Sequence, residues 1–220
     1  MIELQSLLRP PPPPTQNPSL YFAPVGPKAS KQVLVMGTEL GVKEFTPILT
    51  DFTDGKNTKL FEEDLKSKSK LEKLLVGATG QSERFAVPQL RPLTSLTSFL
   101  GEFRTNQQQQ QHQQQHQQYL FICRERSNDH TNIVNILDAY RTAKDACGGL
   151  NSPSISLVVG SEGGWSEKEM ALFDSLSGNS EKVVNVCLGS GSVLRAETAA
   201  VMAVGCLNII SSSSSSSSSS

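Results

Sequence analysis

Two glycine-rich segments contain most of the residues in this sequence that could take part in chemistry. Residues 158–164 include three glycines, and residues 187–199 include two more, followed by Arg195 and Glu197. Glycine lets the backbone come close to a ligand, and the start of a helix offers free N–H groups. The second segment also brings one cation and one carboxylate to an expected helix start. Both segments are therefore candidate ligand-binding turns.

Neither segment is a phosphate-binding loop of a standard kind. The pattern G-x-x-x-x-G-K-[ST] is absent, and the glycine spacing does not fit G-x-G-x-x-G in either place. Two tight structural turns are thus the alternative to a binding site. His112 and His116 have the spacing that puts two side chains on one helix face, which suggests a metal. Without nearby carboxylates or cysteines, a polar repeat is the better interpretation, and we expect no metal.

The elements that would hold these segments alternate between strand and helix. Apolar runs predict strands over 44–49, 119–123, 155–159 and 182–188, and apolar residues at helical spacing predict helices over 32–40, 65–81, 93–103, 133–146, 166–178 and 195–209. Ser166 and Glu169 have the spacing of a capping box at one helix start. This alternation predicts the α/β class, with a parallel sheet covered on both faces. Both glycine-rich segments follow strands, at the edge where open parallel sheets usually bind ligands.

Three stretches of biased composition interrupt this pattern. Residues 1–30 hold eight of the twelve prolines, residues 106–118 are almost all glutamine, and residues 211–220 are ten serines. Such compositions bury too little apolar surface to fold by themselves. We expect disordered ends at 1–30 and 211–220, an inserted surface loop at 106–118, and one compact domain over 31–210.

The composition argues against several classes of protein. The longest apolar stretch without a charge, residues 198–210, has 13 residues, whereas roughly 18 are needed to cross a bilayer. A net charge of −1 gives no basic field to attract nucleic acid. The start lacks the basic and apolar regions of a secretory signal. The scattered cysteines form no C-x-x-C pair, which predicts reduced thiols in an intracellular protein; they are Cys123, Cys147, Cys187 and Cys206.

Four segments together resemble one known family. Residues 160–169 are similar to its G-P-E-G-G-F-S-x-x-E motif, residues 188–199 to L-G-x-x-I-L-R-x-E-T-A, residues 38–42 to T-E-L-G-V, and residues 81–88 to Q-S-x-R-x-x-V-P. The family is that of the small-subunit (16S) rRNA uracil-N3 methyltransferases, within the SPOUT superfamily. The four motifs stand in the family's order, so the resemblance is specific.

The resemblance implies a SPOUT fold with a C-terminal trefoil knot, in which the last helix, residues 195–210, threads through an earlier loop. It also implies a homodimer whose interface includes the knot. The cofactor would be S-adenosylmethionine, held in the knot largely by backbone groups. In this sequence the implied cofactor-binding residues are Gly160, Gly163, Leu188, Gly189 and Leu194, and the strand end near Cys123 is a further candidate.

The implied reaction is methylation of N3 of a uridine in small-subunit rRNA, free or in the assembled small ribosomal subunit. That nitrogen is a poor nucleophile until it loses its proton, and a cation beside a carbonyl oxygen stabilises the resulting anion. Arg195 is the first candidate for this cation, with a salt bridge or an RNA phosphate contact as the alternative. Glu197 could accept the proton or only favour the helix dipole. Arg84 is a candidate RNA or dimer contact.

The sequence also departs from the family. Family members begin with a small β-rich RNA-binding domain, and here a proline-rich segment stands in that place. Ser161 replaces the usual proline of the first motif. Two other functions therefore stay open: a cofactor-binding but catalytically idle protein or assembly factor, and a methyltransferase of tRNA. We expect a cytoplasmic location, with a plastid or mitochondrion as the alternative.

Overall fold

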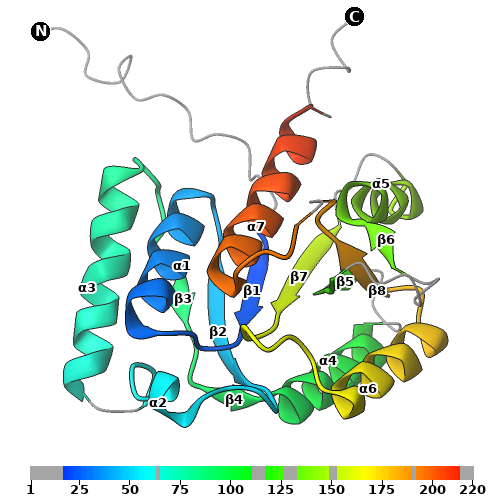
Figure 1. Ribbon diagram of the computed structural model, residues 1–220. Helices are drawn as coiled ribbons and strands as arrows, with labels where there is room; N and C mark the ends of the chain where they lie inside the picture. The colour runs from blue at the N-terminus through cyan, green and yellow to red at the C-terminus, as the bar shows by residue number, and fades with distance from the viewer. Residues whose placement is uncertain are drawn as a thin grey trace, which may run out of the picture.

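The computed structural model describes residues 17–62, 65–110, 117–125, 133–148, 153–189 and 192–213. Its strands form one sheet in the order β3-β2-β1-β7-β5-β8-β6, with β4 paired to β2, and every pair is parallel (Figure 1). The strands are β1 (Ser19–Phe22), β2 (Glu44–Leu49), β3 (Gln89–Leu90), β4 (Thr94–Ser95), β5 (Gln118–Cys123), β6 (Val134–Asn135), β7 (Ser154–Val159) and β8 (Val183–Cys187). The helices are α1 (Pro27–Glu39), α2 (Gly55–Thr58), α3 (Leu65–Gln81), α4 (Leu96–Gln110), α5 (Ile136–Ala146), α6 (Glu167–Asn179) and α7 (Ala196–Ser213).

Helices cover both faces of the sheet, and alternation along β5 shows why. Tyr119, Phe121 and Cys123 belong to the apolar core that includes α1, α3, α5 and α7. Leu120 and Ile122 point the other way, into a second core with α4 and α6. Successive side chains of a strand lie on opposite faces, so a continuous apolar run needs a partner layer on each side. The predicted α/β class with a covered parallel sheet is confirmed.

The expected disorder of residues 1–30 is wrong for residues 17–30, which belong to the fold. β1 lies between β2 and β7 in the middle of the sheet, with Leu20 and Phe22 almost completely buried. Pro27 is the first residue of α1, where the missing N–H costs nothing because no helical partner exists there. Pro18 and Pro24 flank the strand, and Pro27 starts the helix. Consequently α1 begins at residue 27, earlier than the predicted residue 32.

The other two biased stretches are also partly helical. α4 continues through Gln110, and α7 continues through Ser213, so the expected loop and tail do not hold for residues 106–110 and 211–213. Glutamine is a good helix former and serine a tolerable one, so each extends a helix that tertiary packing has already started. His112, His116 and residues 214–220 lie outside the described residues.

Several predicted elements coincide with observed ones. The strand over 44–49 and the helix over 65–81 have the predicted bounds, and the capping box at Ser166 and Glu169 is present. The three two-residue strands β3, β4 and β6 were not predicted, because two residues carry no periodicity. None of the helices within the described ranges is long and apolar enough to cross a membrane.

Candidate functional site

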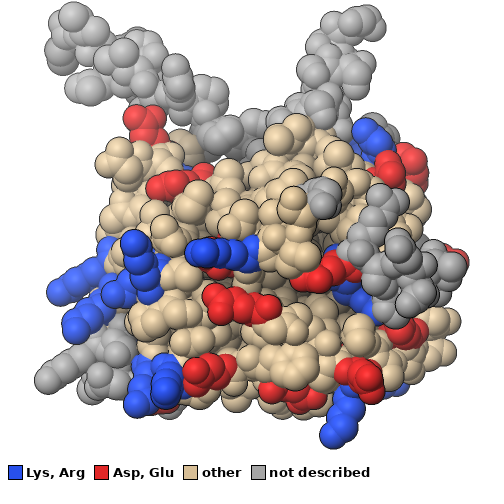
Figure 2. Space-filling model, in the orientation of Figure 1, with Lys and Arg blue, Asp and Glu red and all other residues tan. Residues whose placement is uncertain are grey.

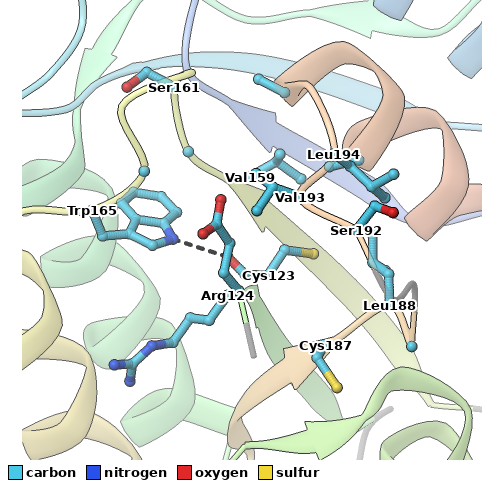
Figure 3. Close-up of a pocket in the computed structure, with 16 residues that line it drawn as sticks. Cys123, Arg124, Val159, Ser161, Trp165, Cys187, Leu188, Ser192, Val193 and Leu194 are labelled. Carbon is cyan, nitrogen blue, oxygen red and sulfur yellow. Dashed lines mark hydrogen bonds between the residues drawn. The ribbon is translucent and has the colours of Figure 1, made fainter. Parts of the chain in front are cut away.

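A cavity of about 370 Å³ lies at the carboxyl ends of β5, β7 and β8 (Figure 3). Because all strands are parallel, their carboxyl ends meet at one edge of the sheet, and both glycine-rich segments start there. Aliphatic side chains and glycine backbone make up most of the wall. The lining residues are Cys123, Arg124, Glu125, Val159, Gly160, Ser161, Gly164, Trp165, Cys187, Leu188, Gly189, Ser192, Val193, Leu194, Ala196 and Ala199.

The first wall of the cavity is the turn after β7, residues 160–164. Gly164 has a φ of +72° and its N–H donates to the carbonyl of Ser161, which closes the turn. A Cβ on Gly160 would lie 3.0 Å from Cε2 of Trp165, so only glycine fits beneath this ring. The Trp165 indole N–H donates to the carbonyl of Cys123 at 2.9 Å. The turn is therefore tied to the end of β5, across the cavity floor.

The second wall is the segment after β8. Gly189 has a φ of +71°, and a Cβ there would meet Nδ2 of Asn135 at 2.9 Å. The Asn135 side chain caps α5 by accepting from the N–H of Leu137. Between Gly189 and the start of α7, Val193 is 76% exposed, whereas Leu194 is half-buried and lines the cavity. Glycine at 189 is thus required by both its dihedral angle and its neighbour.

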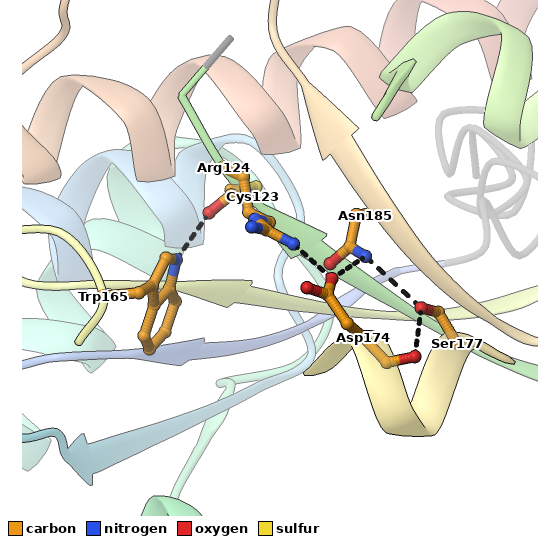
Figure 4. Close-up of polar contacts among 6 residues, drawn as sticks. All are labelled: Cys123, Arg124, Trp165, Asp174, Ser177 and Asn185. Carbon is orange, nitrogen blue, oxygen red and sulfur yellow. Dashed lines mark hydrogen bonds and ion pairs between the residues drawn. The ribbon is translucent and has the colours of Figure 1, made fainter. Parts of the chain in front are cut away.

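A polar network fixes the β5 end of the cavity. Nη1 of Arg124 donates to Oδ1 of Asp174 at 2.7 Å, and Nδ2 of Asn185 donates to the same oxygen at 3.4 Å (Figure 4). Arg124 directly follows β5, Asp174 lies in α6 and Asn185 in β8. The Arg124 side chain is only 3% exposed, and its Nη2 has no hydrogen-bond partner among the described residues. Figure 3 shows the guanidinium directed away from the cavity, so Arg124 holds the strand end in position.

The cysteines near the cavity are thiols with no disulfide. All four cysteines are free; Cys123 and Cys187 are buried, and the other two are half-buried. Burial raises the pKa of the Cys123 thiol to about 12, with further increases from the nearby Cys206 and Cys187. Cys123 is therefore neutral near pH 7 and behaves as a small apolar side chain of the cavity wall. Within the described residues, no group of His, Cys, Asp or Glu could hold a metal ion.

Most of the predicted cofactor-binding residues meet at the cavity. Four of them line it: Gly160, Leu188, Gly189 and Leu194. Gly160 belongs to the turn after β7, whereas the other three belong to the segment after β8. Gly163 does not line it. A Cβ on Gly163 would meet Phe52 at 3.0 Å, so this glycine lies against the turn after β2, and its neighbour Gly164 lines the cavity instead.

The predicted catalytic pair lies at the start of α7, beside the cavity and outside its lining. Arg195 is exposed, between the lining residues Leu194 and Ala196. Glu197 is half-buried, and its Oε2 is buried without a hydrogen-bond partner in the described part of the chain. Whether either acts in catalysis is not tested by this geometry, and both stay predictions.

Arg84 lies at the opposite edge of the sheet. It packs against Gly41, at the amino end of β2, where an added Cβ would lie 2.6 Å from its Nη1. Burial lowers the pKa of Arg84 from its ordinary value. Arg84 is therefore separated from the cavity, and its predicted contact with RNA or a second subunit stays a prediction.

Several lining residues were not among the predicted site residues. Arg124 and Glu125 directly follow β5, and the rule that ligands bind at carboxyl strand ends could have indicated them. Trp165 also lines the cavity, and it was not singled out as a site residue from the sequence. Ser192 and Val193 lie within the second glycine-rich segment, but they were not singled out as site residues.

The profile of the RNA methyltransferase domain family matches residues 12–208. The chain belongs to this family. The match spans β1 and both glycine-rich segments, and so includes the whole described cavity. No curated protein matches the chain significantly.

Solved methyltransferase structures share the fold of this chain. The putative methyltransferase Lpg2936 of Legionella pneumophila, solved with bound SAM, has 24% identity and a TM-score of 0.60, covering 87% of this chain and 66% of its own. The ribosomal RNA small subunit methyltransferase E of Neisseria gonorrhoeae, bound to S-adenosyl methionine, has 19% identity and a TM-score of 0.57, covering 88% and 66%. The SpoU methyltransferase AviRb of Streptomyces viridochromogenes has 16% identity and a TM-score of 0.50, covering 90% and 61%. This chain thus spans about two thirds of the length of these proteins, and at such identities the likeness concerns the fold.

Proposed function

We propose that this chain binds S-adenosylmethionine in the cavity and methylates N3 of a uridine in small-subunit rRNA. The observation that carries the proposal is the meeting of two glycine-rich turns, from separate parts of the chain, at one cavity in a member of the RNA methyltransferase family. Two structural relatives were solved with this cofactor bound, and one of them is a small-subunit rRNA methyltransferase. These relatives support the choice of cofactor and substrate.

The residues present fit such a cofactor. The cavity volume lies within the range of roughly 300–1,000 Å³ usual for small-molecule sites. The aliphatic side chains of Val159, Leu188 and Leu194 suit an apolar ring system. At the glycine turns an added Cβ would meet neighbouring atoms, so backbone alone forms the cavity surface there. Glu125 is an exposed carboxylate at the lining, suited to a cationic group. The cofactor would supply an electrophilic methyl group.

The work left to the protein is alignment and activation of the nucleophile. The exposed position of Arg195 between two lining residues lets its guanidinium reach a uracil carbonyl at the cavity mouth. A cation there would favour loss of the N3 proton. Glu197 is the proposed proton acceptor, and its buried Oε2, which has no hydrogen-bond partner among the described residues, is consistent with a site completed by substrate. The knot, the homodimer and the small ribosomal subunit as partner belong to the same proposal.

The test combines cofactor binding with product analysis. Calorimetry with S-adenosylmethionine should show micromolar-class binding by the wild type and by Arg195→Ala. Nucleoside mass spectrometry after incubation with small-subunit rRNA should find N3-methyluridine for the wild type and none for the variant. Arg104→Ala, which removes an exposed arginine of α4, is the control and should retain full methylation.

The same experiment separates the proposal from its alternatives. No cofactor binding by the folded protein would overturn it. Cofactor binding with methylation of tRNA in place of rRNA would favour the tRNA enzyme. Binding without transfer to either RNA would favour the idle protein or assembly factor.

A further inference from the structure

Phe52 is an apolar side chain on the protein surface that is firmly held in place. It lies in the turn after β2 and is 52% exposed. One side of the residue packs on the backbone of Gly163, where an added Cβ would meet its Cβ, Cγ and Cδ2 at 3.0–3.3 Å. Gly163 stands between Ser161 and Gly164, both of which line the cavity. The exposed ring is thus supported by the same turn that forms the cavity wall.

Hydrogen bonds hold the turn that carries Phe52. The N–H of Thr50 donates to Oγ1 of Thr53 at 3.0 Å, and the N–H of Thr53 donates to the carbonyl of Thr50 at 3.0 Å. The N–H of Asp51 donates to Oε1 of Glu169 at 2.9 Å, and the Ser166 hydroxyl donates to Asp51. Hydrogen bonds therefore hold the turn around Phe52 in two ways: one pair closes the turn itself, and the other pair joins it to the start of α6.

Such a connection restricts the position of the ring without burying it. A phenylalanine that served only stability would gain from full burial, because transfer of its apolar side chain out of water is favourable. The acidic side chains beside it have structural roles: Asp51 accepts from Ser166, and Asp54 caps α2 by accepting from the N–H of Lys56. The turn therefore exposes the aromatic ring beside the cavity wall, together with Asp51 and Asp54, whose carboxylates are engaged in these contacts.

The surface beyond Phe52 carries exposed lysines. Figure 2 shows basic side chains gathered on the side of the molecule formed by α1, α2 and α3. The exposed lysines on these helices are Lys28, Lys31, Lys56, Lys68, Lys70 and Lys73, and Lys59 directly follows α2. Helices α1 and α2 begin at the same edge of the sheet as the cavity, because they follow the carboxyl ends of β1 and β2. A polyanion along this side therefore lies beside Phe52.

We propose that Phe52 is a substrate-positioning residue that stacks on a base of single-stranded RNA flanking the target uridine. The proposal rests on the proposed function for its RNA substrate. Proteins that act on a base hold the unstacked neighbours by aromatic side chains, and lysines follow the phosphates. The turn at 161–164 separates the ring from the cavity interior, which assigns Phe52 to a neighbouring nucleotide and leaves the cavity for the target.

The test uses a short single-stranded oligouridine carrying one 2-aminopurine, whose fluorescence is quenched by stacking. Wild type should bind and quench the probe. Phe52→Ala should bind it about tenfold more weakly, in keeping with the stacking energy of one base, and should lose the quenching. Phe52→Trp should retain both. Val76→Ala, which truncates a similarly exposed side chain on α3, is the matched control and should behave as wild type.

Cofactor affinity separates a positioning role from a structural one. Phe52 does not line the cavity, so calorimetry with S-adenosylmethionine should give the same affinity for wild type and Phe52→Ala. Equal loss of cofactor and RNA binding would overturn the proposal, as would unchanged RNA binding or a change of oligomeric state in place of RNA affinity. Weaker probe binding by Phe52→Ala without methyl transfer by any variant would retain the role of Phe52 and reject the proposed function. Methyl transfer to rRNA that is equal in wild type and Phe52→Ala would support the proposed function and reject the role of Phe52.

Discussion

At the scale of single residues, the cavity depends on backbone conformations that side chains would disturb. Gly160 lies under the Trp165 ring, and Gly189 combines a left-handed φ with a neighbour that leaves no space for a Cβ. A residue with a Cβ pays for the left-handed conformation with roughly 1–2 kcal/mol. The glycines therefore determine the shape of the cavity more than any charged group does.

Gly189→Ala should lower both the free energy of unfolding and the cofactor affinity. The unfolding loss should be about 1–2 kcal/mol from the φ alone, and the displacement of Asn135 should also disturb the wall. Urea denaturation and calorimetry with S-adenosylmethionine measure the two effects. Gly178→Ala, in α6 where an added Cβ meets nothing, is the control and should be neutral or slightly stabilising. Equal behaviour of the two variants would contradict the argument.

The Cys123 thiol should make stability depend on alkaline pH. Its folded-state pKa is raised from 9.0 to about 12, so its contribution is fully present below pH 9 and is lost as pH rises from about 9 to 12. In this range the unfolded chain ionises the thiol and the folded protein does not. Denaturation curves for wild type and Cys123→Ala should therefore show a shallower alkaline loss in the variant. An identical loss of stability with rising pH in wild type and Cys123→Ala would contradict this contribution of the thiol. A thiol reagent at pH 8 should also leave Cys123 unmodified in the native protein.

At the scale of elements, the start of α6 organises the edge of the sheet around the cavity. Glu169 is 6% exposed and accepts two backbone hydrogen bonds, from Ser166 in its own capping box and from Asp51 in the turn after β2. The Glu169 side chain thus completes the cap of α6 and links the turn after β2 to the start of this helix. The sequence indicated the cap, whereas the second contact joins residues 118 positions apart.

Glu169→Ala should destabilise the protein by about 2–3 kcal/mol, because two partly buried backbone N–H groups lose their carboxylate acceptor. Glu169→Gln keeps one carbonyl acceptor and should cost less. Glu167→Ala, in the exposed first turn of the same helix, removes only a favourable dipole interaction and should cost no more than roughly 0.3–1 kcal/mol. Urea denaturation of the three variants gives the comparison, and an equal cost for residues 167 and 169 would refute it.

At the scale of the whole molecule, parallel strands place all functional segments at one edge of the sheet. α7 runs from that edge to the opposite one, where the Asn208 side chain donates to the carbonyl of Leu40. It packs on α1, and both helices carry exposed apolar side chains, Met36 at 42% and Ile209 at 70%. These side chains are candidates for the proposed homodimer interface, since an apolar face on two packed helices suits a second copy.

Ile209→Asp should convert the proposed homodimer to a monomer. A carboxylate placed in an apolar interface loses hydration without gaining a partner, whereas on a monomer surface it is tolerated. Sedimentation would measure the mass, and circular dichroism would check that the fold is retained. Val76→Asp, at a similarly exposed site on α3, should leave the mass unchanged. A dimer that persists in Ile209→Asp would exclude this face as the interface.

Local patterns in the sequence were enough to predict the α/β class, the strand at 44–49, the helix at 65–81, the cap of α6 and four residues that line the cavity, Gly160, Leu188, Gly189 and Leu194. These follow from local physics: apolar periodicity, capping chemistry and the glycines needed for close backbone approach. Tertiary contacts were needed to show that residues 19–22 form a central strand, because their burial between β2 and β7 comes from distant partners. It also placed Gly163 behind the cavity, Arg84 at the opposite edge and Phe52 beside the turn at 161–164. Contacts between residues so far apart in the chain depend on how the layers pack, which no local pattern records.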